Sequence, residues 1–270
     1  MSTISGEVHI ILLVCAFVAT GKMDLASAEA GKFTAVIGYK GWFNQWLTGT
    51  LNNDTTNGAH VSAFESDYEY TSIPVISLRY DNLFVSGSFY MPTKFSFPDT
   101  SYRITYTTVG TITETAKTTA EREEWDTSIG YYVHPSIGLT VGYKNIQQEY
   151  TTTLRSPGIV YTPATTKSTT TIKGPTVGIT GGYPLGSGFG AYYAFSYGWL
   201  ESSYEGVSRT DDSSYRLTDI GFSFKPGTTP LAFTLGYRSQ LIDTKFPTYL
   251  GEQIGPDDTK GFVLGANLIF

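Results

Sequence analysis

The chain has 270 residues, a formal net charge of −6 and a single cysteine, Cys15. Tyr, Phe and Gly are abundant, with 20, 16 and 29 residues, and this composition favours β-strands over helices. The acidic balance, without clustered Lys and Arg, argues against a nucleic-acid-binding protein, and a single cysteine excludes an internal disulfide framework and a Cys-based metal site.

Residues 1–30 are predicted to be a cleavable signal peptide. Residues 10–19 form an apolar run that is too short for a helix spanning a bilayer. It is followed by Ala28-Glu29-Ala30, an A-x-A pattern that signal peptidase cleaves. The segment departs from the usual pattern because Glu7, and no Lys or Arg, precedes the apolar run. A buried N-terminal strand or helix is the alternative. Cleavage would remove Cys15 and leave residues 31–270 as one domain.

Ten strands are predicted from the alternation of apolar with small or polar residues. In the last strand, for example, Phe262, Leu264, Ala266, Leu268 and Phe270 share one face. The predicted strands lie near residues 33–47, 71–80, 83–97, 121–133, 136–150, 172–184, 188–204, 214–225, 230–243 and 259–270. Each is long enough for a membrane strand, which needs about 9 to 11 residues. Strands of a soluble β-sandwich alternate in the same way, so this pattern alone does not identify membrane strands.

The connections between these strands alternate between short and long. Tight turns are predicted at Asp81-Asn82, His134-Pro135, residues 185–187 and residues 226–229, where Asp, Asn, Gly and Pro occur. Long segments are predicted at residues 48–70, 98–120, 151–171, 205–213 and 244–258. Short turns on one side and long loops on the other are typical of outer-membrane barrels. The long loops are rich in Thr, so we expect some strands to continue into them as hairpins; disordered tethers are the alternative.

The A-x-A site, the terminal Phe270, the strand alternation and the rhythm of turns and loops resemble the small bacterial outer-membrane β-barrel proteins, a general, porin-like class. The resemblance covers essentially the whole mature chain. It implies an all-β fold, a closed antiparallel transmembrane up-and-down β-barrel of about ten strands, in the bacterial outer membrane. It also implies the lipid bilayer, lipopolysaccharide and, through the last strand, the barrel-assembly machinery as partners. No cofactor is expected.

Aromatic residues on the outward face of the predicted strands lie at two levels. Phe189 and Trp199 are ten residues apart on one strand, which corresponds to roughly 25 Å along the barrel axis, the height of the apolar band. Two aromatic girdles are therefore predicted, one of Tyr80, Tyr183, Phe189, Phe224 and Phe270, and one of Trp125, Tyr143, Trp199, Tyr237 and Phe262. The same rings could instead fill the core of a soluble sandwich.

Charged residues on the inward face of the strands are the main candidates for a functional site. They are Lys40, Arg79, Glu124, Asp126, Lys144, Asp219 and Arg238. A hairpin centred on Pro135 places Asp126 opposite Lys144. Buried charges are tolerated when they are paired, so we predict a salt-bridge network that fixes the register; the charged constriction of a pore is the alternative. Inward glycines such as Gly130 either leave space in the lumen or support aromatic side chains.

These features predict a narrow passive pore or a partly occluded channel for small solutes or ions. Eight strands enclose an interior that side chains can fill, and ten strands lie near that limit. Trp42, Tyr132 and Tyr192 face inward in the predicted register and could close the lumen. The alternative function is a non-conducting platform that presents Thr-rich extracellular loops for adhesion or surface interaction.

Signals for an enzyme are weak, and no enzymatic activity is expected. His60 lies in the first long loop between Asp54 and Asp67, and such residues could in principle act as in the surface proteases called omptins. This omptin-like protease is the more distant alternative, because nothing in the sequence fixes the geometry of these side chains. His134 is predicted to be a turn residue. No metal-ligand spacing and no nucleotide-binding motif appears in the sequence.

Overall fold

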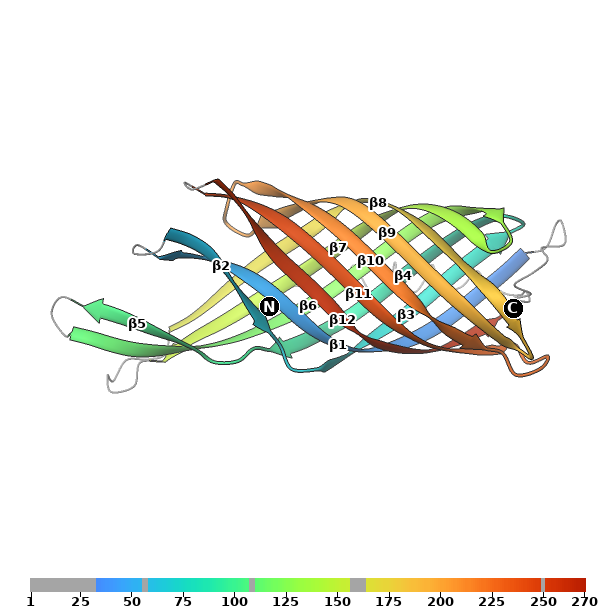
Figure 1. Cartoon of the computed structure of the whole chain (residues 1–270), viewed down its shortest axis with the longest axis horizontal. Coiled ribbons are helices and arrows are strands. Elements are labelled where there is room, and N and C mark those ends of the chain that lie inside the picture. The colour runs from blue at the N-terminus through green and yellow to red at the C-terminus, as the bar shows by residue number, and fades with distance from the viewer. Residues whose placement is uncertain (1–32, 55–57, 107–109, 156–163, 249–250) are drawn as a thin grey trace, which may run out of the picture.

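The computed structural model describes residues 33–54, 58–106, 110–155, 164–248 and 251–270. These residues form a closed antiparallel β-barrel with ten strands in its wall (Figure 1). Within these ranges, the chain has no helix that is both long and apolar enough to cross a bilayer. The signal peptide predicted for residues 1–30 lies outside the described residues.

The wall strands follow one another in chain order around the barrel, and the last pairs with the first. They are β1 (Phe33–Asp54), β3 (Glu69–Tyr80), β4 (Leu83–Ser96), β6 (Gly110–His134), β7 (Ile137–Arg155), β8 (Ala164–Gly186), β9 (Phe189–Tyr204), β10 (Thr210–Phe224), β11 (Leu231–Thr248) and β12 (Gly251–Ile269). Two further strands, β2 (Gly58–Glu65) and β5 (Thr100–Tyr106), pair with the far parts of β1 and β6. Figure 1 shows β5 projecting beyond the wall at the end opposite to the C-terminus.

Short turns connect the wall strands at one end of the barrel, which we call the turn end; the opposite end is the loop end. The turns lie at Asp81-Asn82, Pro135-Ser136, Ser187-Gly188 and residues 225–230, each within one or two residues of the prediction. Asp81 and Ser187 have positive φ angles of 51° and 53°, which tight hairpin turns require. His134 ends β6, and its Nδ1 accepts a hydrogen bond from the Ser136 N–H at 3.2 Å.

All ten predicted strands are present, and the structure corrects their lengths at the loop end. β6 begins at Gly110 and β8 at Ala164, well before the predicted starts near residues 121 and 172. The additional residues are Thr-rich, and Thr favours extended backbone. The expectation that strands continue into the long loops as hairpins is therefore confirmed.

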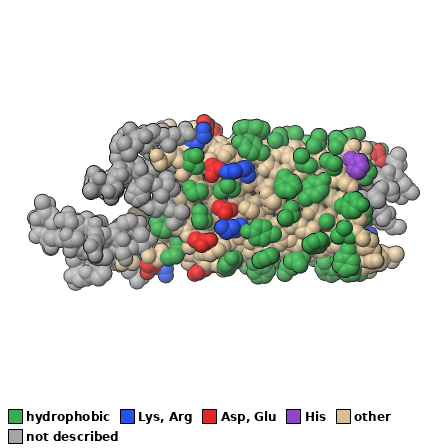
Figure 2. All heavy atoms as spheres, in the orientation of Figure 1, with side chains coloured by type: hydrophobic (Ala, Val, Ile, Leu, Met, Phe, Trp, Pro, Cys, Tyr) green, Lys and Arg blue, Asp and Glu red, His purple; other side chains and the backbone are tan. Residues whose placement is uncertain are grey.

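Hydrophobic side chains cover much of the outer wall in Figure 2, and charged side chains gather toward the loop end. Nine of the ten residues predicted for the girdles are exposed on this wall: Tyr80, Trp125, Tyr143, Tyr183, Phe189, Trp199, Phe224, Tyr237 and Phe262. Several lie ring to ring with a neighbour, such as Phe189 with Phe224 at 4.6 Å between centroids. Phe270 is half-buried, and its N–H donates to the Ala35 carbonyl at 2.9 Å. Contact of these rings with lipid stays a prediction.

Inward glycines make room for aromatic side chains in the lumen. A Cβ atom placed on Gly130 would lie 2.2 Å from the ring of Phe84, and one on Gly236 would lie 2.1 Å from the Tyr192 hydroxyl. Both distances are shorter than van der Waals contact, so an alanine at either position would displace the aromatic ring. At these positions glycine serves packing rather than open space.

The pairing between β3 and β4 is the shortest in the wall. It covers six residue pairs and ends at Val75 with Ser88, whereas β1 and β3 pair over twelve. Beyond this point each strand carries a proline, Pro74 and Pro92, which has no N–H to donate. The two chain segments meet again where the N–H of Asp67, two residues before β3, donates to the carbonyl of Ser96, the last residue of β4, at 3.2 Å. We call the stretch between these two contacts the β3–β4 seam.

Candidate functional site

A carboxylate with two cations lies in the middle part of the lumen. Asp219 Oδ2 on β10 is 3.3 Å from Lys40 Nζ on β1 and 3.4 Å from Arg238 Nη1 on β11. Asp219 and Arg238 are both buried. Removing charges from water is costly, and pairing offsets that cost. One buried carboxylate therefore links three strands of the wall.

A second group of ion pairs lies closer to the loop end. Glu124 on β6 is 2.7 Å from Arg122 Nε and 2.6 Å from Lys144 Nζ on β7. The Glu124 side chain is 2% exposed and that of Lys144 is 1% exposed. Arg122 Nη1 also lies 2.8 Å from Asp257 Oδ1 on β12. These four charges balance one another, so the group carries no net charge.

Tyr90 on β4 connects the two groups. Its hydroxyl accepts a hydrogen bond from Arg238 Nη2. Lys144 Nζ lies 4.8 Å from the centroid of its ring and the Arg238 guanidinium lies 5.0 Å from it. Both cations are thus stabilised by the aromatic ring as well as by carboxylates. Trp42 on β1 packs edge-on against the same ring at 6.2 Å, so aromatic and charged side chains fill the centre of the barrel together.

An aromatic layer covers this network on the side of the loop end. The ring of Trp46 lies 5.2 Å from Phe95, 5.6 Å from Phe97 and 5.6 Å from Tyr150. Its indole N–H donates to Asp257 Oδ1 at 2.9 Å. A separate apolar cluster is formed by Ile146, Ile172, Leu200, Tyr215 and Ile242. Side chains therefore occupy the lumen beyond the charged groups as well.

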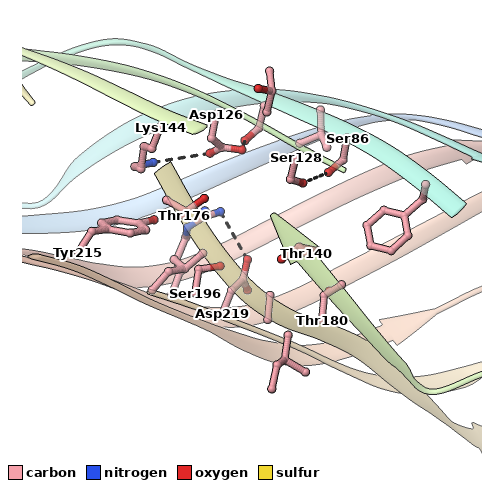
Figure 3. Close-up of a pocket in the computed structure, with 18 of the residues that line it drawn as sticks. Ser86, Asp126, Ser128, Thr140, Lys144, Thr176, Thr180, Ser196, Tyr215 and Asp219 are labelled. Atoms are coloured by element: carbon pink, nitrogen blue, oxygen red, sulfur yellow. Dashed lines mark hydrogen bonds and ion pairs between the residues drawn. The ribbon is translucent and has the colours of Figure 1, made fainter. Parts of the chain in front are cut away.

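The free space in the lumen decreases from the turn end toward the loop end. At the turn end, Arg79, Tyr132 and Lys225 help to line a cavity of about 490 Å³. Next to it lies a cavity of about 200 Å³, into which Asp126, Ser128 and Asp219 are directed (Figure 3). Beside Arg122 and Glu124 only about 10 Å³ remains, roughly the space of one water molecule. Among these three cavities, the free volume thus falls from about 490 to about 10 Å³ toward this level.

Five of the seven charges predicted to face the lumen belong to these groups: Lys40, Glu124, Lys144, Asp219 and Arg238. A sixth, Asp126, lies beside the second group, 3.6 Å from Lys144 Nζ, and is partly exposed. The register places Asp126 opposite Lys144 as predicted. Arg79 joins neither group. Its Nε donates to the Asp81 carbonyl at 2.6 Å, and its guanidinium lies 4.3 Å from the centre of the Tyr132 ring. A role of these charges in ion preference stays a prediction.

Two central members of the network, Arg122 and Asp257, were not among the predicted residues. Arg122 lies two positions before Glu124 on the same strand, so the alternation along β6 could have identified it. Asp257 could not be found in this way because the last strand was predicted to begin near residue 259. Trp42 is buried in the lumen, whereas Tyr132 and Tyr192 line the wider cavity at the turn end; closure of the lumen by these rings stays a prediction.

Two histidines, His60 and His134, lie in the part of the chain that the structure describes. His60 lies in β2 opposite Asn52, and its side chain is outside the described part of the chain. His134 is exposed at the turn end. No group of three or more His, Cys, Asp or Glu side chains suited to a metal ion occurs among the described residues.

No family model and no curated protein matches the sequence. Among solved structures, the chain is similar to the outer membrane protease OmpT from Escherichia coli, with a TM-score of 0.51 and 13% identity over 88% of this chain and 96% of that chain. The attachment invasion locus protein Ail of Yersinia pestis matches with a TM-score of 0.32 and 11% identity, over 90% of this chain and all of that one (100%). The COG4313 outer membrane channel from Pseudomonas putida F1 matches with a TM-score of 0.33 and 10% identity, over 93% of this chain and 100% of that chain.

The last two similarities are too loose to inform the fold in detail, and the similarity to OmpT concerns the fold and not the activity. Its TM-score of 0.51 over 88% of the chain shows that the two chains share the overall fold. The chain therefore has a closed ten-stranded antiparallel β-barrel fold, similar to that of the outer membrane protease OmpT.

Proposed function

We propose that this protein is a non-conducting outer-membrane barrel, without enzymatic activity, that supports interaction hairpins at the cell surface. The observation that carries the proposal is the reduction of free lumen space to about 10 Å³ beside Arg122 and Glu124. Passage of ions requires a continuous water-filled path. Ten strands enclose little more space than the eight-stranded barrels that side chains fill, and here charged and aromatic side chains occupy it.

The closed state is expected to be stable because opening it would separate buried charges. Arg122, Glu124 and Lys144 are each buried and each has a partner of opposite charge. Leaving one of them without its partner costs about 3 to 5 kcal/mol. Spontaneous opening of the lumen along this network is therefore disfavoured.

The loop end offers the surface on which a partner would bind. The hairpins β1–β2 and β5–β6 and the paired far ends of β7 and β8 extend the sheet there. An exposed ion pair joins Lys167 on β8 to Glu149 on β7 at 2.5 Å, and the Glu149 carboxylate raises the pKa of Lys167. Among the described strands, β5 pairs with β6 alone. A free strand edge of this kind can accept an added strand from a partner protein.

A narrow passive pore is the second candidate function. It is favoured by the two cavities of about 490 and 200 Å³ that follow each other from the turn end inward. Conduction would require the side chains around Tyr90 and Trp46 to move aside.

Single-channel recording of the purified, refolded barrel in planar bilayers tests the proposal. We expect no conductance steps above the baseline for the natural chain. A variant with Trp46→Ala, Tyr90→Ala and Phe95→Ala, which removes aromatic side chains and retains the charges, serves as the opened control and is expected to give small steps. Steady steps from the natural chain would contradict the proposal and favour the pore.

A further inference from the structure

The cavity at the turn end, which we call the vestibule, has the size of a ligand site. Its volume of about 490 Å³ lies within the range of roughly 300 to 1,000 Å³ that is typical of small-molecule pockets. Turn residues such as Pro135, Gly188 and Gly227 contribute to its lining, so it lies at the mouth of the barrel. A soluble molecule can reach it whether or not the lumen conducts.

The charge in the vestibule is predominantly positive. Lys40, Arg79 and Lys225 line it, and Asp219 is the one acidic side chain among the described residues of its lining. Lys40 is already paired with Asp219 at 3.3 Å. Neither Arg79 nor Lys225 has a carboxylate partner within the part of the chain that the structure describes. Two uncompensated cations therefore favour an anion in this cavity.

Arg79 is held in a geometry suited to binding an anion. Its Nε donates to the Asp81 carbonyl at 2.6 Å, and its Cζ lies over the Tyr132 ring, 4.3 Å from the ring centre. Neither of its Nη groups has a hydrogen-bond acceptor among the described residues. A guanidinium fixed at one edge and one face can present its remaining N–H groups to a carboxylate or phosphate as a bidentate fork. Little side-chain entropy would then be lost on binding.

The rest of the lining is mainly apolar. Ala191, Ala232, Ile269 and the ring of Tyr132 contribute to it. The hydroxyl of Thr234 also lines the cavity, and its Oγ1 is buried without a hydrogen-bond partner within the described ranges. An inorganic anion would leave the apolar lining without contacts, whereas a neutral apolar molecule would not use Arg79. The cation Arg79 and the apolar lining together favour a molecule that carries an anionic group and an apolar part.

We propose that the vestibule binds a small amphipathic anion, such as an aromatic carboxylate. The anionic group is bound by Arg79, with Lys225 adding positive charge from the opposite rim, and the apolar part packs against Tyr132 and the alanines. This inference is independent of whether the barrel is a platform or a pore.

Binding of 4-fluorobenzoate to the refolded barrel in micelles, followed by ¹⁹F NMR, tests the proposal. We expect saturable broadening of the ligand signal relative to protein-free micelles, and none with the neutral analogue 4-fluorobenzamide. Arg79→Gln should weaken binding by about tenfold or more, since a hydrogen bond to a charged group is lost, and Lys225→Gln by a smaller factor. Lys173→Gln, on the exposed outer wall, is the matched control and should leave the affinity unchanged.

Three outcomes would overturn the proposal. The first is no binding of 4-fluorobenzoate to the natural barrel, and the second is equal binding of 4-fluorobenzamide. The third is displacement of 4-fluorobenzoate by inorganic phosphate at the same concentration, because the site would then recognise charge alone. If Arg79→Gln fails to fold by circular dichroism, Tyr132→Leu provides a second variant, which removes the ring behind the guanidinium. Unchanged affinity in that variant would contradict the assigned geometry.

Discussion

Lys144 on β7 lies opposite Asp126 on β6 in the barrel wall, yet its ammonium group is closer to Glu124, at 2.6 Å, than to Asp126, at 3.6 Å. The Glu124 side chain is 2% exposed, whereas that of Asp126 is 34% exposed and lines the cavity of about 200 Å³. The long lysine side chain thus extends beyond Asp126, its partner in the strand register, to Glu124, the more deeply buried carboxylate. The energetic contribution of Lys144 should therefore depend on Glu124 and not on Asp126.

The first prediction concerns this choice of partner. Lys144→Met should lower the free energy of unfolding by about 3 to 5 kcal/mol, because it leaves Glu124 short of a cation in a buried site. Asp126→Asn should lower the free energy of unfolding by less than about 1 kcal/mol, since the Asp126 carboxylate is partly solvated. Urea unfolding of the barrel in lipid vesicles measures both. Equal losses for the two variants would contradict this choice of partner, because the contribution of Lys144 would then depend on Asp126.

The second prediction concerns coupling within the network. Combining Lys144→Met with Glu124→Gln should destabilise the barrel less than the sum of the two single changes. The neutral amide no longer needs the ammonium group, while Arg122 keeps its pairing with Asp257 at 2.8 Å. A coupling free energy of about 0.5 to 3 kcal/mol is expected from a double-mutant cycle. Strict additivity would mean that Lys144 and Glu124 do not interact in solution.

The third prediction concerns topology. Single cysteines at Thr165, Arg209 and Ile254, whose side chains are exposed at the loop end, should react with a membrane-impermeant maleimide on intact cells. Cysteines at Asn82 and Thr228 in the turns should react only after the outer membrane is opened. Asp211 and Gly255 lie in equivalent loop regions but are buried, so they are poor labelling sites. Labelling of the turn positions on intact cells would show the opposite orientation, with the turn end outside the cell.

The fourth prediction applies to the opened control with Trp46→Ala, Tyr90→Ala and Phe95→Ala. Adding Lys40→Met should shift its ion preference toward cations, because Asp219 then keeps only Arg238 as a partner and charge at a constriction sets selectivity. Reversal potentials in a salt gradient measure this preference. The same variant with Lys173→Gln, on the outer wall, is the control, and an equal shift there would show that the lumen charges do not govern permeation.

The strand pattern was predictable from the sequence because each wall strand has one face toward the outside and one toward the lumen, which produces a period of two. The strand boundaries at the loop end could not be predicted in this way, because Thr-rich segments without a buried apolar face show no such period. Asp257 was placed in a loop for a different reason: it lies in Gly255-Pro256-Asp257-Asp258, a sequence typical of turns, although it pairs with Arg122. Strand pairing placed Asp126 opposite Lys144, but it could not show that Lys144 reaches Glu124, since that depends on the path of a flexible side chain across the lumen.

The β3–β4 seam determines where this barrel is mechanically weakest. Six residue pairs hold β3 to β4, whereas β11 and β12 are joined by eighteen. The ion pairs of the lumen connect β1 with β10, β10 with β11, and β6 with β7 and β12, and none of these four connections joins β3 to β4. A lateral force on the wall would therefore part these two strands before any others. The barrel would then open as a sheet with β3 and β4 as its edges, and the pairing between its first and last strands, β1 and β12, would remain intact.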